Sequence, residues 1–211
     1  MTRRLELDPN SPDPKGVAEA AAVIRRGGLV ILPTDTAYGL AGDPKDPAVV
    51  KRILTIKERQ QKAGMPVLAA NLNQARQIAS LSQVAENLAQ RFWPGALTLI
   101  LPTRRDFPEG VLGPGGTLAV RIPNHLVALH VINYVGFAVT GTSANRSGAP
   151  SPRTAEDASS QLGPEVDLVL DGGSTLHTAD STIVDCTVHP LQIVRAGAVP
   201  KTALRPWLEL H

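Results

Sequence analysis

The chain has 211 residues, enough for one sizeable domain, and its 43% apolar and 19% charged residues are ordinary for a globular protein. A net charge of +2 and an aromatic share of 3% argue against a protein that binds nucleic acid through a strong positive field or through base stacking. The single cysteine excludes an intramolecular disulfide and a metal site built from cysteines.

The first residues lack the apolar segment of a secretion signal, and no apolar run is long enough to cross a membrane. We therefore expect a cytoplasmic protein without a membrane partner. In chain order, the first predicted element is a helix over 14–26: Pro14 suits its first position, and Gly27 and Gly28 end it. A buried strand over 29–32 follows and leads into the polar stretch 33–42, PTDTAYGLAG.

Helices and strands alternate along the rest of the chain. Helices are expected over residues 47–57, 73–81, 82–92, 125–134, 153–162 and 202–209. Strands are expected over residues 66–70, 96–102, 117–123, 137–143, 166–170, 181–186 and 191–195. Between them, the segment 103–116 is rich in proline and glycine, which predicts an irregular loop and leaves a lid over the site as the alternative.

This alternation indicates an α/β fold with a mixed sheet flanked by helices. No linker or internal repeat divides the sequence, so we expect a single domain over residues 1–211. Familiar catalytic motifs are absent: the chain has no GxxxxGK[ST] loop, no GxGxxG turn, no GxSxG elbow and no histidines at metal-binding spacing. No metal site built from protein ligands is therefore predicted.

Four polar loops follow predicted strands and carry small hydroxyl, amide or guanidinium side chains next to glycine or proline. They are 33–42, 139–150, 171–185 and 193–197. Such donors suit phosphates and carboxylates, and ligands of open α/β sheets bind at strand ends. Any one of these loops could equally consist of ordinary turn formers, but four in one domain favour convergence on a site.

A basic run over 51–62 allows two interpretations. A solvated helix face is one. The other depends on Lys57 and Arg59, which cannot share a helix face because they lie two positions apart. Both reach one ligand only where the helix has ended, and a lysine beside an arginine fork is suited to a polyphosphate.

Six motifs together resemble one family. PTDTAYGL, KER, TLAVRIP, TSANRSG, DSTIVD and IVRAG occur in the order found in the YrdC-like family, the threonylcarbamoyl-AMP synthases, and the resemblance covers about residues 15–200. It implies a twisted mixed sheet flanked by helices around a concave, basic pocket. It also implies a nucleotidyltransferase that joins L-threonine, bicarbonate and ATP into threonylcarbamoyl-AMP and releases pyrophosphate.

The resemblance also implies partners. Transferase proteins would move the threonylcarbamoyl group to an adenosine of tRNA, and Mg²⁺ is inferred from the chemistry of ATP. The reaction is largely a matter of positioning and charge neutralisation, so an enzyme of this kind needs no covalent intermediate. This explains why the sequence lacks a nucleophile-base pair.

Site residues are carried over motif by motif. The catalytic set that matches the family is Lys57, Arg59, Ser143 and Asn145. The set expected to bind ATP is Lys57, Arg59, Thr117, Asn145, Arg153 and Arg195. The set expected to bind threonine is Thr34, Arg121, Ser143 and Ser181, with Arg121 facing the α-carboxylate. Two roles stay open: Tyr38 either walls the pocket or packs, and Asp35 either meets a metal ion or points away.

Two alternatives compete with the synthase. A related protein could hold tRNA or double-stranded RNA on the same concave surface without synthase activity, and such binding would depend steeply on salt. A carbamoyl-transfer module of the hydrogenase-maturation kind is the second. That module belongs to much larger chains with zinc-finger segments, which a chain with one cysteine does not match.

Overall fold

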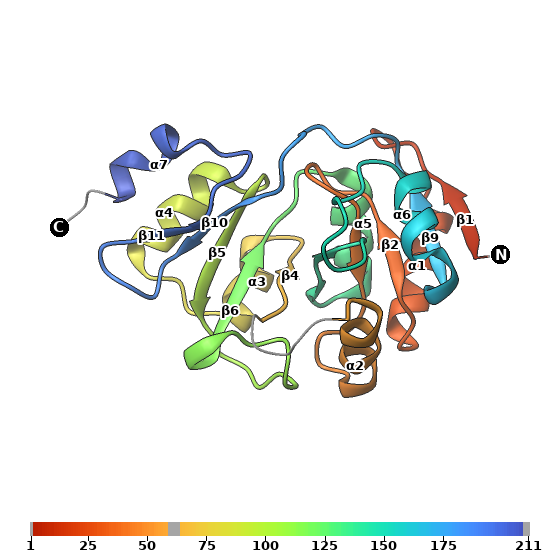
Figure 1. Ribbon diagram of the computed structural model, residues 1–211, viewed down its shortest axis with the longest axis horizontal. Coiled ribbons are helices and arrows are strands. Elements are labelled where there is room, and N and C mark those ends of the chain that lie inside the picture. Colours follow the sequence, from red (N-terminus) through yellow and green to blue (C-terminus); the bar gives the residue numbers. More distant parts are fainter. Residues whose placement is uncertain (1, 59–63, 209–211) are drawn as a thin grey trace.

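Two β-sheets form the framework of the protein in the computed structural model, which describes residues 2–58 and 64–208 (Figure 1). The five-stranded sheet has the order β1 (Arg3–Glu6), β9 (Leu168–Asp171), β2 (Val30–Leu32), β3 (Gly39–Ala41) and β8 (Thr142–Ser143). The six-stranded sheet has the order β11 (Gln192–Arg195), β10 (Thr182–Asp185), β5 (Leu97–Pro102), β6 (Thr117–Arg121), β4 (Val67–Leu68) and β7 (Val139–Thr140). Both sheets mix parallel and antiparallel pairs, which confirms the predicted α/β class.

The helices lie close to their predicted positions. They are α1 (Pro14–Arg25), α2 (Pro47–Ile56), α3 (Leu72–Ile78), α4 (Gln83–Phe92), α5 (Leu126–Val135), α6 (Ala155–Leu162) and α7 (Lys201–Leu208). Side-chain caps set several starts: Ser82 accepts a hydrogen bond from the Ala85 amide, and Thr154 accepts one from the Asp157 amide. Short 3-10 turns at Pro114–Gly116 and Gly163–Glu165 complete the helical elements described.

The division into two sheets differs from the single sheet that the sequence predicts. The run 137–143 reads as one strand, but it forms two short strands on either side of Gly141, with β7 in the six-stranded sheet and β8 in the five-stranded sheet. A Cβ at Gly141 would lie 2.5 Å from the Leu68 side chain, so only glycine lets the chain cross at this point. The sheets are thus joined beside the polar loop that follows Ser143.

Two strands were not predicted. β1 is a charged edge strand with mostly exposed side chains, so it lacks the apolar alternation of a half-buried strand. β3 lies inside the polar stretch 33–42, where it pairs antiparallel with β2. Within the described ranges, no helix combines the length and apolar character needed to cross a membrane.

The apolar core lies on both sides of the sheets. α1 and α5 pack together with β2 and β9 through residues such as Ile24 and Val131, both fully buried. A second cluster joins α2, α3 and α4 to the six-stranded sheet. This packing fixes the strand ends from which the polar loops extend.

Candidate active site

A cavity of about 390 Å³ is lined by both sheets and by the loops at their strand ends. Its walls include residues of the stretch after β2, of β5, β6, β10 and β11, and of the loop after β8. The polar and charged lining residues are Thr34, Thr36, Lys57, Thr98, Arg121, Thr142, Ser143, Asn145, Ser147, Asp180, Ser181 and Arg195. Segments distant in sequence therefore converge on one concave site.

Lys57 follows α2 directly and organises the loop after β8. It is 5% exposed, and its ammonium group donates to the Ser143 carbonyl at 2.8 Å, the Asn145 carbonyl at 2.7 Å and Asn145 Oδ1 at 2.6 Å. Ser143 Oγ also bonds to Asn145 Oδ1, at 2.6 Å. Because an ammonium has three N–H groups, these three contacts match its donors and fix the loop around a buried positive charge.

Arg121, at the end of β6, is held on three sides. Its Nε donates to the Gly95 carbonyl at 2.9 Å, one terminal nitrogen donates to Thr36 Oγ1 at 2.6 Å, and the other forms an ion pair with Asp35. The side chains of Arg121 and Asp35 are 7% and 1% exposed. Burial lowers the pKa of the Arg121 guanidinium, while the charge and hydrogen bond of Asp35 act in the opposite direction.

This pair gives the orientation of Asp35: its carboxylate faces the Arg121 guanidinium, and Asp35 itself is not among the lining residues. Its Oδ1 also accepts from the Asn124 amide at 2.9 Å. Its Oδ2 is buried without a hydrogen-bond partner among the described residues, 4.0 Å from His177 Nε2. Asp35 thus compensates the buried positive charge of Arg121.

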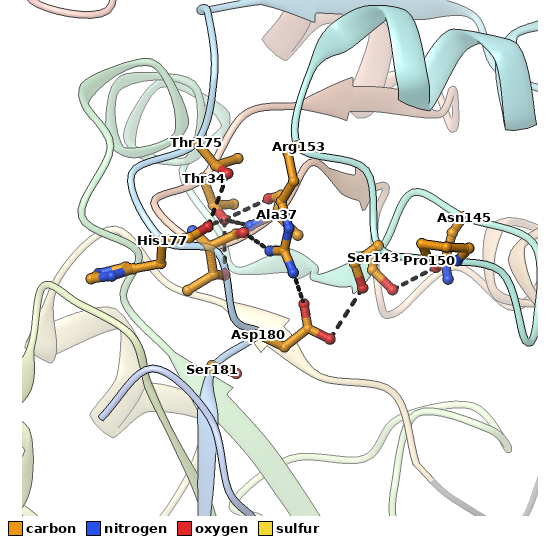
Figure 2. Close-up of polar contacts among 12 residues, drawn as sticks. Thr34, Ala37, Ser143, Asn145, Pro150, Arg153, Thr175, His177, Asp180 and Ser181 are labelled. Carbon is orange, nitrogen blue, oxygen red and sulfur yellow. Dashed lines mark hydrogen bonds and ion pairs between the residues drawn. The ribbon is translucent and has the colours of Figure 1, made fainter. Parts of the chain in front are cut away.

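The Thr34 side chain closes a local turn. Its hydroxyl donates to the Ala37 carbonyl at 2.6 Å and accepts from the Ala37 amide at 3.2 Å (Figure 2). Tyr38 is fully buried and donates to the Gly173 carbonyl at 2.6 Å, so its ring packs in the core although the residue borders the cavity. Tyr38 therefore both packs in the core and contributes to the wall of the cavity, the two roles considered for it from the sequence.

On the opposite wall, Arg195 and Ser181 contact each other. Arg195 of β11 is exposed and donates to the Ser181 carbonyl at 2.9 and 3.1 Å and to Ser181 Oγ at 3.0 Å. Ser181 Oγ also lies 2.8 Å from Thr98 Oγ1. The guanidinium therefore presents its charge at the cavity beside two linked hydroxyl groups.

Arg153 and Asp180 link two loops at the site. Arg153 donates to the Thr36 carbonyl, and its other terminal nitrogen lies 3.2 Å from Asp180 Oδ1 (Figure 2). Asp180 lines the cavity, whereas Arg153 is not among the lining residues. The contact ties the stretch before α6 to the stretch before β10.

Most residues expected at the site line the cavity. Those that do are Thr34, Lys57, Arg121, Ser143, Asn145, Ser181 and Arg195. Thr117 does not; its hydroxyl donates to the Pro114 carbonyl at 3.1 Å. Arg59, expected beside Lys57, lies outside the described residues.

Five polar lining residues were not among the predicted site residues: Thr36, Thr98, Thr142, Ser147 and Asp180. Thr98 lies in a strand whose apolar neighbours conceal its role in the wall. Asp180 directly precedes Ser181 in the motif DSTIVD. Because Ser181 was predicted to bind threonine, its neighbour in the sequence could have been considered for the site as well. Among the described residues, no cluster of three or more His, Cys, Asp or Glu could hold a metal ion.

With the site defined, the fold can be compared with known proteins. The family model Sua5/YciO/YrdC, described as "Telomere recombination", matches residues 22–197. The crystal structure of Pyrococcus abyssi Sua5 in complex with L-threonine superposes with a TM-score of 0.92 at 33% sequence identity. That superposition covers 99% of this chain and 61% of the Sua5 chain.

Curated relatives carry a consistent name. A Pyrococcus abyssi protein named threonylcarbamoyl-AMP synthase is 38% identical over 86% of this chain and 54% of its own length. A Mycobacterium tuberculosis protein named putative threonylcarbamoyl-AMP synthase is 34% identical over 94% of this chain and 92% of its own length.

The fold and cavity define an α/β protein with a polar cavity between two sheets. The chain belongs to the Sua5/YciO/YrdC family. It spans about half the length of the Pyrococcus abyssi relative.

Proposed function

We propose that the protein is an L-threonylcarbamoyladenylate synthase, which condenses L-threonine, bicarbonate and ATP and releases pyrophosphate. Family membership and the names of the relatives support this activity. The observation that carries it is the cavity, in which three cations, Lys57, Arg121 and Arg195, converge with hydroxyl and amide groups. Such a site can hold a polyphosphate and an amino-acid carboxylate together.

The nucleotide lies, in this proposal, against Lys57, Ser143, Asn145 and Arg195, with Arg59 joining them. Lys57 contributes its charge from beneath the loop, because its N–H groups are engaged by Ser143 and Asn145. Arg195 contributes from the opposite wall. Arg153 and Thr117, also expected to bind ATP, lie outside the lining and would need to reach in from its edge.

Threonine lies against Thr34, Arg121, Ser143 and Ser181. Arg121 is positioned for the α-carboxylate because Asp35 and Thr36 hold its plane while the residue still lines the cavity. The carbamate formed on the threonine nitrogen is then close to the α-phosphate. Acceleration comes from positioning the reactants and neutralising their charge.

Mg²⁺ would enter with the nucleotide. Asp180 is the one carboxylate among the described lining residues, and the described chain offers no cluster of metal ligands. Those residues do not form a protein-built metal site, so phosphate oxygens and water supply its ligands, as is common for Mg²⁺.

We further propose that the product is passed to tRNA threonylcarbamoyl-transferase proteins in the cytoplasm. We also propose that residues 1–211 act as one domain, because the strands of each sheet come from distant parts of the chain.

Pyrophosphate release tests the activity. Purified protein with ATP and Mg²⁺ should release pyrophosphate only when threonine and bicarbonate are both present, and serine should substitute poorly for threonine. Release without threonine, or no release alongside salt-sensitive binding of tRNA or double-stranded RNA, would contradict the proposal.

A further inference from the structure

Asp180 is an unexpected residue in a cavity proposed to hold a triphosphate. Three charged lining residues, Lys57, Arg121 and Arg195, are cations, and Asp180 is the only described lining residue with the opposite charge. A carboxylate repels phosphate. Its presence therefore indicates a different ligand group nearby.

The carboxylate of Asp180 retains capacity to accept hydrogen bonds. Its Oδ1 lies 3.2 Å from an Arg153 nitrogen, and its Oδ2 accepts from Ser151 Oγ at 3.1 Å. The Arg153 contact is longer than the usual upper value of about 2.9 Å for an N–H···O bond between charged groups, and the Ser151 contact is longer than about 2.7 Å, the usual upper value for a hydroxyl bonded to a carboxylate. Because two carboxylate oxygens offer about four acceptor positions, a further donor can bind.

The backbone that carries Asp180 is tightly fixed. The Asp180 carbonyl accepts from the Ala198 amide at 2.8 Å. A Cβ on Gly197 would lie 2.3 Å from that carbonyl oxygen, so the loop after β11 packs directly on the start of β10. The position of the carboxylate at the cavity is therefore built into the fold.

Asp180 and Arg121 both line the cavity and carry opposite charges. Beside the larger effects of burial and of Asp35, the charge of Arg195 acts to lower the pKa of the Arg121 guanidinium and the charge of Asp180 acts to raise it, so Arg121 lies within electrostatic reach of both groups. The arrangement offers a cation for a carboxylate and an anion for a neighbouring N–H group. An α-amino acid carries these two groups on one carbon atom.

We propose that Asp180 accepts a hydrogen bond from the α-amino group of the amino-acid substrate and thereby determines specificity at the threonine end of the cavity. This inference rests on the proposed function and adds to it a residue that selects for the amine. Threonine carries an ammonium group at neutral pH, and a neighbouring carboxylate favours that charged form. Asp180 therefore acts in binding and orienting the amine, whose nitrogen must lose a proton before it bonds to the carbon supplied by bicarbonate.

A divalent cation fits Asp180 less well. The carboxylate already faces the Arg153 guanidinium, which would repel a dication at the same oxygen atoms. No second carboxylate lines the described part of the cavity. An ammonium group carries a single positive charge and needs no second carboxylate, so neither obstacle excludes it.

Calorimetry with two matched ligands tests the proposal. L-threonine and (R)-3-hydroxybutyrate share a carbon skeleton, carboxylate and hydroxyl, but only threonine has the amine. Wild-type protein should prefer threonine. Asp180→Asn should weaken threonine binding about tenfold, as expected for one hydrogen bond to a charged group, and leave (R)-3-hydroxybutyrate unchanged. Asp180→Glu should recover part of the preference.

Asp185→Asn is the matched control, because Asp185 is the last residue of β10, the strand that follows Asp180, and does not line the cavity. Equal weakening of both ligands in Asp180→Asn would show a structural role and overturn the proposal. Weaker binding of Mg²⁺-ATP with unchanged threonine affinity would assign Asp180 to the metal and overturn it too. If wild-type protein binds Mg²⁺-ATP but neither L-threonine nor its analogue, the result contradicts the proposed function itself, and the role of Asp180 is rejected together with it.

Discussion

At the scale of single residues, the buried cations of the site act as organisers as well as charges. Lys57 and Arg121 are 5% and 6% exposed, and most of their N–H groups donate hydrogen bonds to other groups of the protein. Burial of a charge is unfavourable unless partners compensate it. Most of the compensating groups belong to the loops that line the cavity, so charge and loop position are coupled.

Replacing Lys57 tests this coupling. Lys57→Met keeps the length of the side chain but leaves the Ser143 carbonyl and both Asn145 oxygens without their donor. We expect the free energy of unfolding to fall by about 1–3 kcal/mol, measured by denaturant titration. Pyrophosphate release should fall about 10²-fold as the site loses a preorganised charge.

Lys51→Met is the matched control, because Lys51 lies on α2, the helix that ends directly before Lys57, and has an exposed side chain. It should change stability and activity little. Equal effects of the two substitutions would show that Lys57 has no special role.

Asp35 gives a second test at this scale. Asp35→Asn removes the charge that compensates the buried Arg121, and breaking such a pair costs about 3–5 kcal/mol in unfolding free energy. Glu19→Gln, which breaks the exposed pair with Arg3, should cost less than about 1 kcal/mol. If thermal and denaturant unfolding gave the two variants the same stability, Asp35 would not be compensating Arg121.

At the scale of elements, the site depends on strand ends and on close backbone contacts. β10 and the loop after β11 approach so closely that Gly197 has no room for a side chain. This contact aligns Asp180, Ser181 and Arg195, three groups of one wall.

Gly197→Ala should therefore disturb the wall. A methyl group there would overlap the backbone of Asp180 and Ser181, and we expect a loss of about 1–3 kcal/mol in unfolding free energy. Threonine binding, followed by calorimetry, should weaken as well. Gly163→Ala is the control, because the nearest atom to a Cβ there lies 3.8 Å away and its φ of −46° suits alanine. Unchanged stability in Gly197→Ala would contradict the close contact.

The elements were largely predictable from local signals. Pro14 and Ser82 mark helix starts through general capping chemistry, and both helices begin there or at the next residue. The switch at Gly141 was not predictable, because a short apolar run looks the same whether its two halves pair with one sheet or with two.

At the scale of the whole molecule, the two sheets enclose the cavity, and chain segments from residue 34 to residue 195 contribute to it. Polar loops at strand ends indicated this convergence from sequence. The burial and partners of each side chain were out of reach, because they depend on contacts between distant segments. The pairing of Asp35 with Arg121 is one example.

In the proposed reaction, one cavity joins three substrates. The most direct test is product analysis by mass spectrometry after incubation of the protein with ATP, Mg²⁺, L-threonine and ¹³C-bicarbonate. We predict an adenylate that contains threonine and one ¹³C atom, formed only when all three substrates are present. An adenylate without the label, or no threonine-containing product while ATP is consumed, would contradict the account.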